Sequence, residues 1–171
     1  MTDRPLLLDL FCSSFGAGMG YVQAGFDVIG WDLIKRRDMP DSPHVTFVKG
    51  DALQALSDLD YLRTFDAIHA SPPCQTHSIT QHLRDAQGKG TDKVNLIPQT
   101  RAGLEASGLP YVMENVPGAP MREDLMLCGS MFPDLHVHDE TGRRFLQRHR
   151  VFETNVEMSP PGPCDHAGAG V

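Results

Sequence analysis

The sequence predicts an α/β fold in which an open sheet carries helices on both faces. Short apolar runs of strand length recur along the chain and are separated by segments of helical spacing, a pattern that favours βαβ units and a parallel sheet. The first run, residues 6–11, leads through a glycine-containing turn into a helix, as a nucleotide-binding βαβ unit does. Several runs end directly on polar or reactive residues. Because ligands of open α/β sheets bind outside the carboxyl ends of the strands, these residues mark the expected site.

Length and composition are those of one ordinary globular domain. The chain has 171 residues, 40% of them hydrophobic and 22% charged, and no apolar run reaches the length of about 18 residues that a membrane span needs. The four cysteines are widely spaced without a pairing pattern, which favours free thiols in a reducing cytoplasm. We expect one folded domain over residues 1–158 and a loosely ordered tail, rich in proline and glycine, over residues 159–171.

The charge of the chain is acidic but unevenly distributed. A formal net charge of −7 argues against a surface that binds nucleic acid as a whole. Residues 143–150 nevertheless hold four arginines in eight positions. This segment is either a local basic site for nucleic acid or the solvated face of a strand or helix.

A glycine turn and an acidic strand end follow the first predicted strand. The turn contains three glycines, Gly16, Gly18 and Gly20. A helix is expected over residues 21–24, and the next strand, residues 26–31, ends on Asp32. An acidic residue about 20 positions after a glycine turn suits the hydroxyls of a ribose. The alternative is a surface carboxylate at the start of a loop.

A second acidic residue follows the third predicted strand. Residues 45–48 form this short strand, and residues 52–62 have leucines on one helical face. Asp51 lies between the two segments. It is expected either to cap the helix or to accept a hydrogen bond from an adenine amino group.

A cysteine follows the fourth run across a stiff turn. Residues 65–70 are predicted to form a buried strand, and Pro72 and Pro73 then end the ladder and restrict the backbone. Cys74 therefore lies just past a strand end, where it is either a nucleophile or, as free cysteine often is, a small buried hydrophobe. The polar residues 76–93 are predicted to form a long loop of a kind that is usually functional or disordered.

A carboxylate and an amide follow the next strand. A helix is expected over residues 95–107 and a buried strand over residues 109–113, which ends on Glu114 and Asn115. Desolvation at the edge of an apolar strand raises the pKa of a glutamate, which suits a proton donor. The alternative is a glutamate that pairs with a nearby arginine.

The last part of the chain contains one more expected strand and a hint of metal binding. The strand covers residues 151–153. In the tail, Cys164 and His166 are residue types that bind metals, but two ligands do not make a site and the chain has no Cys-x-x-Cys. We therefore expect no metal.

Taken in chain order, the strand-end residues form a recognisable constellation. The chain resembles the cytosine-5 DNA methyltransferases over nearly its whole length, and most of all the small forms met in bacteriophages and bacteria. The most specific segments are residues 71–78 (SPPCQTHS), 114–116 (ENV), and 9–12 (DLFC) with 24–26 (AGF) at the family's spacing. The resemblance implies a Rossmann-like sheet that binds S-adenosylmethionine, DNA as the partner, and the cytoplasm of a bacterial or phage-infected cell.

The resemblance also implies a mechanism and its catalytic residues. Cys74 would add as a thiolate to carbon 6 of cytosine, which makes carbon 5 nucleophilic. Glu114 would donate to ring nitrogen 3. Arg150, with Arg148 beside it, would contact the cytosine carbonyl.

Binding residues are implied in the same way. Those implied at the cofactor S-adenosylmethionine are Asp9, Phe11, Gly16, Gly18, Asp32 and Asp51. Those implied at the substrate are Pro73, Gln75, Ser78 and Asn115. Pro73 would present its carbonyl to the cytosine amino group, and Asn115 would support the turn.

The chain departs from the family pattern at three places. Ser13, Ser14 and Phe15 stand where the first turn of the family has glycines, so the three glycines that follow are the expected substitutes. The glutamine before Arg-x-Arg falls on Leu146, with Gln147 one residue late. The chain ends about 20 residues after that motif, without the usual target-recognition region and later motifs. Strong target specificity is therefore expected only with a partner chain or in a longer parent protein.

Three functions remain open on these residues. The first is methylation of carbon 5 of cytosine in DNA. The second is methylation of a free pyrimidine nucleotide, because thiolate addition at carbon 6 does not require DNA. The third is a methyltransferase-like binding protein that retains affinity for cofactor or DNA without independent activity.

Overall fold

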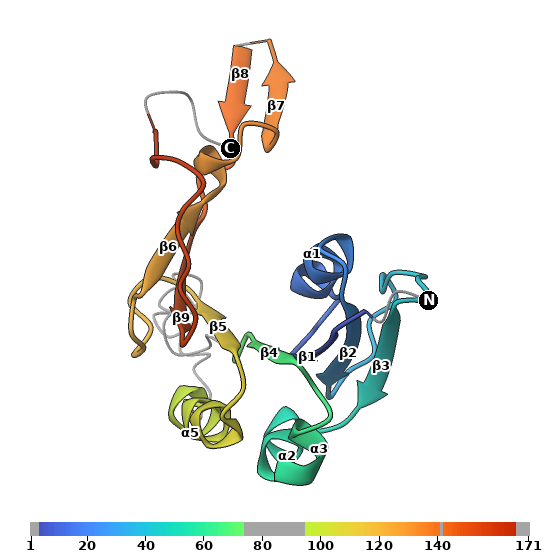
Figure 1. The fold of residues 1–171 in the computed structure, drawn as a ribbon. Coiled ribbons are helices and arrows are strands. Elements are labelled where there is room, and N and C mark those ends of the chain that lie inside the picture. The colour runs from blue at the N-terminus through green and yellow to red at the C-terminus, as the bar shows by residue number, and fades with distance from the viewer. Residues whose placement is uncertain (1–3, 74–94, 141, 167–171) are drawn as a thin grey trace, which may run out of the picture.

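The structure, a computed structural model, describes residues 4–73, 95–140 and 142–166 (Figure 1). Within these ranges the chain forms a seven-stranded sheet, a separate two-stranded hairpin and helices that pack on the sheet. The strands are β1 (Leu6–Leu10), β2 (Asp27–Asp32), β3 (Val45–Lys49), β4 (Ala67–Ala70), β5 (Tyr111–Asn115), β6 (Leu125–Cys128), β7 (His136–Asp139), β8 (Gly142–Phe145) and β9 (His149–Thr154). The helices are α1 (Gly16–Gln23), α2 (Ala52–Ser57), α3 (Leu59–Leu62), α5 (Ile97–Ser107) and the 3-10 turn η1 (Gly129–Met131).

The first five strands form a parallel, doubly wound unit. The strand order of the sheet is β3-β2-β1-β4-β5-β9-β6, and β1 pairs with both β2 and β4. Leu8 of β1, for example, lies between Ile29 and Ile68. The order reverses between β1 and β4, and in such sheets the ligand crevice lies outside the carboxyl ends of the strands at this switch point. The α/β fold predicted from the sequence is confirmed.

The last strand in the sequence, β9, is an internal strand of the sheet. β9 runs antiparallel between β5 and β6, with Leu127 of β6 opposite Arg150. In the sequence, β7 and β8 lie between β6 and β9. They form a hairpin that projects beyond the sheet (Figure 1). The arginine-rich segment is therefore divided, because residues 142–145 belong to the hairpin and residues 149–154 to the main sheet.

Helices cover both faces of the sheet, as the sequence predicts. α1 packs on one face, and α2, α3 and α5 pack on the other (Figure 1). Successive side chains of β1 alternate between two apolar cores, because neighbours in a strand point to opposite faces. The larger core, beneath α2, α3 and α5, includes Leu8, Leu10, Leu56, Ile68, Leu104 and Met113. The smaller core, beneath α1, contains Leu7, Cys12, Phe15 and Val28.

A bidentate ion pair fixes α5 to β9. Arg101 donates from Nε and Nη2 to the two carboxylate oxygens of Glu153 at 2.6 and 2.7 Å, and the main-chain N–H of Arg122 donates to the same carboxylate at 2.9 Å. Glu153 is fully buried. Burial raises the pKa of Glu153, but the hydrogen bonds from Arg101 and Arg122 outweigh burial and lower the pKa.

Two helices differ from the sequence prediction. The segment predicted as one helix over residues 52–62 is divided at Asp58, whose carboxylate accepts a hydrogen bond from the Tyr61 N–H and caps α3. α1 begins at Gly16 and not at Tyr21, so the glycines belong to the helix. Within the described ranges, no helix has both the length and the apolar composition that crossing a membrane requires.

Candidate functional site

A cavity of about 440 Å³ opens at the switch point of the sheet. Its volume lies in the range of small-molecule sites. Residues at the carboxyl ends of β1, β2 and β4 line it, together with the start of α2. Among the predicted site residues, those in its lining are Phe11, Asp32, Asp51 and Pro73.

The turn between β1 and α1 contains three residues with positive φ angles, a conformation typical of glycine, although none of the three is glycine. Phe11, Ser13 and Phe15 have φ angles of 59°, 47° and 61°, in the left-handed region that residues with a Cβ rarely adopt. Phe15 is held in this conformation by burial, because its ring is inaccessible to solvent and occupies the space next to Gly30. A Cβ at Gly30 would collide with that ring.

The glycines expected to compensate for the missing turn glycines do not do so. Gly16, Gly18 and Gly20 lie in α1, and none of them has a positive φ. The conformation that the family pattern assigns to glycine is instead adopted by Ser13 and Phe15 themselves. The chain therefore forms the turn at the cost of local backbone strain.

Asp9, Gly16 and Gly18, which the resemblance places at the cofactor, do not line the cavity. Asp9 is 1% exposed beneath the turn, where the Gly18 N–H favours the charged form of its carboxylate, and its Oδ2 has no hydrogen-bond partner among the described residues. A Cβ at Gly18 would lie 2.9 Å from Asp9 Oδ2, so the approach requires glycine. Burial raises the pKa of Asp9 to about 7, and the charge of Asp32 adds to the rise. In this structure Asp9 and Gly18 support the turn, and their role at the cofactor stays a prediction.

Asp32 connects the two loops that border the cavity. Its Oδ2 accepts a hydrogen bond from the Ser13 N–H and its Oδ1 from the Ile34 N–H, each at 3.0 Å. A carboxylate oxygen accepts more than one hydrogen bond, so these contacts leave acceptor sites for the hydroxyls of a ligand. The same loop adds Leu33 and Arg36 to the lining, neither of which the sequence analysis singled out.

Asp51 caps α2, as predicted. Its Oδ1 accepts a hydrogen bond from the Leu53 N–H at 2.9 Å. Asp51 also lines the cavity, so its two predicted roles do not exclude each other. The cap uses one oxygen, and the second remains an acceptor for a ligand.

The proline turn is held by a buried amide. Asn115 is 2% exposed, and its Nδ2 donates to the Pro72 carbonyl at 3.0 Å. Its Oδ1 accepts from the Val116 N–H at 2.9 Å. The side chain therefore joins the end of β5 to the turn after β4, which agrees with its predicted support of the turn, while its place at the substrate stays a prediction. The predicted site residues outside the described ranges are Cys74, Gln75 and Ser78.

Glu114 pairs with the arginine that the resemblance assigns to the cytosine. Arg150 Nε lies 2.5 Å from Glu114 Oε1, and the two side chains are 25% and 22% exposed. Burial raises the pKa of Glu114, while Arg150, Ser71 and Arg148 act in the opposite direction without cancelling the rise. The predicted alternatives for Glu114, a raised pKa and a pairing with arginine, therefore hold together.

A buried polar chain, not predicted from the sequence, reaches Glu114. The Tyr21 hydroxyl lies 3.2 Å from His69 Nδ1, and His69 Nε2 lies 2.9 Å from Ser71 Oγ. The Ser71 side chain in turn favours the charged form of Glu114 and so lowers its pKa. Burial lowers the pKa of His69 to about 4, so the ring is neutral, with one donor and one acceptor. When Ser71 donates its single proton to the Glu114 carboxylate, His69 Nε2–H must donate to Ser71, and Nδ1 must accept from Tyr21.

This polar chain orients the carboxylate of Glu114. A detectable signal existed in the sequence, because His69 and Ser71 are two positions apart at the end of an apolar strand and therefore share a face. Ser71 also lines the cavity, so it connects the cavity to the Glu114–Arg150 pair.

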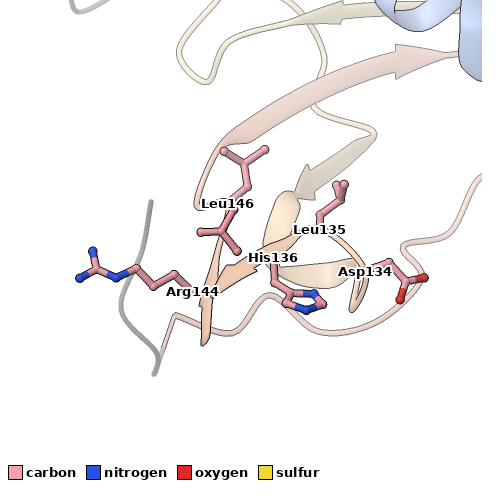
Figure 2. Close-up of a pocket in the computed structure, with 6 residues that line it drawn as sticks. Asp134, Leu135, His136, Arg144 and Leu146 are labelled. Atoms are coloured by element: carbon pink, nitrogen blue, oxygen red, sulfur yellow. The ribbon is translucent and has the colours of Figure 1, made fainter. Parts of the chain in front are cut away.

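A second hollow, of about 250 Å³, lies on the β7–β8 hairpin. Figure 2 shows Leu135, His136 and Leu146 between the side chains of Asp134 and Arg144, which extend to opposite sides. None of the predicted site residues lines it. The cavity at the switch point is therefore the candidate site.

No family model and no curated protein matches the chain. Among solved structures, it is similar to a SAM-dependent methyltransferase from Neisseria gonorrhoeae, at 12% identity over 96% of this chain and 64% of that chain, with a TM-score of 0.47. A SAM-dependent methyltransferase from Agrobacterium tumefaciens matches at 17% identity over 67% of this chain and 39% of that chain, with a TM-score of 0.40. The Bordetella bronchiseptica enzyme WbmH in complex with NAD+ matches at 16% identity over 64% and 55%, with a TM-score of 0.34.

The chain spans less than two thirds of the length of each of these three proteins. Their identities and TM-scores are low, so the fold class follows from the order and direction of the strands themselves. That class is the Rossmann-like α/β sheet, extended here by an antiparallel strand between β5 and β6.

Proposed function

We propose that this protein transfers a methyl group from S-adenosylmethionine to carbon 5 of cytosine in DNA, with Cys74 as the nucleophile. One observation carries the proposal: residues that the family resemblance assigns to a single site come from separate strands and converge at the switch point. Phe11, Asp32 and Pro73 line one cavity. The Glu114–Arg150 pair is joined to that cavity through Ser71.

The cavity offers groups that suit S-adenosylmethionine. Asp32 would accept hydrogen bonds from the ribose hydroxyls, and Asp51 would accept one from the adenine amino group. Phe11 and Leu33 offer apolar surface for the rings. When bound, the cofactor supplies an electrophilic methyl group on a sulfonium.

The residues of the chain would make carbon 5 of cytosine reactive. The Cys74 thiolate forms a bond to carbon 6, Glu114 holds a proton at ring nitrogen 3, and Arg150 neutralises charge at the carbonyl oxygen. Methyl transfer to carbon 5 would break the methyl–sulfur bond of the cofactor and leave a neutral thioether. The hydrogen at carbon 5 would then leave as a proton to a base, and breaking of the sulfur–carbon 6 bond would return the Cys74 thiolate. A base bound against Glu114 adds to the desolvation that raises its pKa, which favours the protonated acid.

The choice of DNA as substrate is supported by the resemblance and by the arginine-rich segment. Cytosine in a duplex is out of reach of a thiolate at a strand end, so the target base would have to leave the stack. Arg148 is exposed two residues before Arg150, and its charge would attract a phosphate of the flipped nucleotide. Sequence preference should be weak if these 171 residues act alone.

The deciding experiment measures transfer of labelled methyl from S-adenosylmethionine to duplex DNA and to dCMP. We expect label in DNA and covalent trapping of the protein by DNA that contains 5-fluorocytosine. Cys74→Ala should abolish both signals while cofactor binding, measured by calorimetry, persists. Cys12→Ala, which removes a different, buried thiol, is the matched control and should still be trapped.

Each other outcome contradicts a stated part of the proposal. Label in dCMP but not in DNA would favour a nucleotide methyltransferase. Cofactor binding without any transfer would indicate a binding protein. Trapping that persists in Cys74→Ala would exclude this cysteine as the nucleophile.

A further inference from the structure

Four side chains that bind metals meet beside the last two strands of the sheet. Cys128 ends β6, His149 begins β9, and the two residues are cross-strand partners. Cys164 and His166 come from the tail, which turns back after β9 and runs alongside β6 and β9 toward the hairpin (Figure 1). Neither the cavity at the switch point nor the polar chain to Glu114 includes any of the four.

The spacing of the four ligand atoms is that of a tetrahedral site. His166 Nε2 lies 3.2 Å from both sulfurs, and Cys164 Sγ lies 3.4 Å from His149 Nε2. All four atoms lie within 4.8 Å of one another. With Zn–S near 2.3 Å and Zn–N near 2.0 Å, the edges of a ligand tetrahedron measure about 3.3–3.8 Å. The three shortest separations need to change by only tenths of an ångström to accept the ion, and the widest would shorten by at most about 1–1.5 Å.

Hydrogen bonding among the four groups does not account well for their convergence. Thiols are weak donors and weak acceptors, so two cysteines and two imidazoles satisfy one another poorly. Cys164 and His166 are exposed on an irregular tail, and fixing such a segment costs conformational entropy. A metal ion would supply the missing stabilisation.

We propose that Cys128, His149, Cys164 and His166 bind one zinc ion in a structural site. Two thiolates and two imidazoles in a tetrahedron are a zinc-selective ligand set, and protein ligands fill all four positions, which leaves none for water or substrate. The two thiols release their protons to solvent when the ion binds. Ser130 extends the site, because its hydroxyl donates to Cys128 Sγ at 3.3 Å and would stabilise the thiolate.

The proposed site differs from the expectation that the chain has no metal. The sequence shows two ligands in the tail, and the fold adds two more from strands that lie 15 and 36 residues before Cys164. The zinc would hold the base of the β7–β8 hairpin closed, fasten the tail to the sheet, and fix the first residue of β9. The proposal does not depend on methyl transfer, so either can fail alone.

Metal analysis of protein prepared without an affinity tag that binds metals tests the proposal. We expect about one zinc per chain, as in other closed sites. After chelation, loading with Co²⁺ should give the visible absorption of tetrahedral cobalt and a thiolate-to-cobalt charge-transfer band in the near ultraviolet. Cys164→Ser and His166→Asn should each lose the charge-transfer spectrum of the intact site or weaken metal binding by at least about tenfold.

Matched controls separate this site from adventitious binding. Cys12→Ala and His44→Asn remove one cysteine and one histidine outside the cluster and should retain the full metal content. The tail variants alter exposed side chains, so circular dichroism should show a folded sheet in each. The proposal is overturned if wild-type protein binds neither zinc nor cobalt stoichiometrically, if the Cys164→Ser/His166→Asn double variant keeps its zinc, or if Cys128 and Cys164 form a disulfide under reducing conditions.

Discussion

Asp9 should make the protein less stable as the pH rises, and Asp9→Asn should remove this dependence. Burial raises the pKa of Asp9 from 3.8 in the unfolded chain to about 7 in the folded protein. Between these values the folded state keeps a proton that the unfolded state has released, so the free energy of unfolding falls with rising pH. A pKa difference of about 3 units at about 1.4 kcal/mol per unit corresponds to about 4 kcal/mol.

His69 acts in the opposite direction over an overlapping range. Burial lowers the pKa of His69 from 6.5 to about 4, so its contribution to stability is present above pH 6.5 and is lost as the pH falls through 4. The effect amounts to about 3 kcal/mol. The two groups nearly cancel in the wild-type protein between pH 4 and 6.5. In Asp9→Asn the contribution of His69 is no longer offset by Asp9, so stability should rise more steeply across this range than in wild type.

Urea unfolding of wild type and Asp9→Asn at a series of pH values measures the effect. The stability of the variant relative to wild type should increase by about 4 kcal/mol from pH 4 to pH 7.5, because all other titrating groups are shared and cancel. Asp60→Asn changes a carboxylate that is 90% exposed and should follow the wild-type curve. A difference between Asp9→Asn and wild type that does not vary with pH would refute the reasoning.

Three further predictions concern the turn, the anchor of α5 and the cofactor. Ser13→Gly should raise the free energy of unfolding by about 0.5–1 kcal/mol in urea titrations, because glycine adopts a positive φ without strain. Ser14→Gly should lower it by a similar amount, and equal changes in the two variants would show that the backbone of Ser13 is not strained. Glu153→Ala should lower the free energy of unfolding by about 3–5 kcal/mol, since Arg101 keeps a charge without its partner; a loss below 1 kcal/mol would show that the pair is replaceable. Asp32→Asn should weaken S-adenosylmethionine binding by about 1–3 kcal/mol in calorimetry, and unchanged affinity would remove Asp32 from the site.

Much of the site was predictable because it depends on local structure. Polar residues that directly follow apolar strands must lie at the carboxyl edge of a parallel sheet, which is why Asp32, Asp51 and Pro73 share one cavity. The cap at Asp51 is a contact between neighbours in sequence, so its residue type alone indicates it. Cys74 stays a prediction, since it lies outside the described residues.

The features that were not predicted depend on contacts between distant parts of the chain. Arg101 and Glu153 are 52 positions apart, and no local pattern states that β9 enters the sheet beside β5. The zinc ligands are hidden for the same reason, because register, and not sequence distance, places Cys128 opposite His149. The left-handed conformation of Ser13 was not predicted either, since serine rarely adopts a positive φ and its residue type does not indicate one.

The insertion of β9 between β5 and β6 also sets the order in which the protein can assemble during translation. The five parallel strands can pair as they leave the ribosome. One edge of β5 then stays unpaired until β9 is complete at Thr154, 39 residues after Asn115. At roughly 5–20 residues per second, synthesis leaves that edge open for about 2–8 seconds. An unpaired edge strand is a template for association with other chains, so this interval is the one in which a nascent chain most needs a chaperone. Arg150 arrives with β9, and a chain stalled before that point carries Glu114 without its partner.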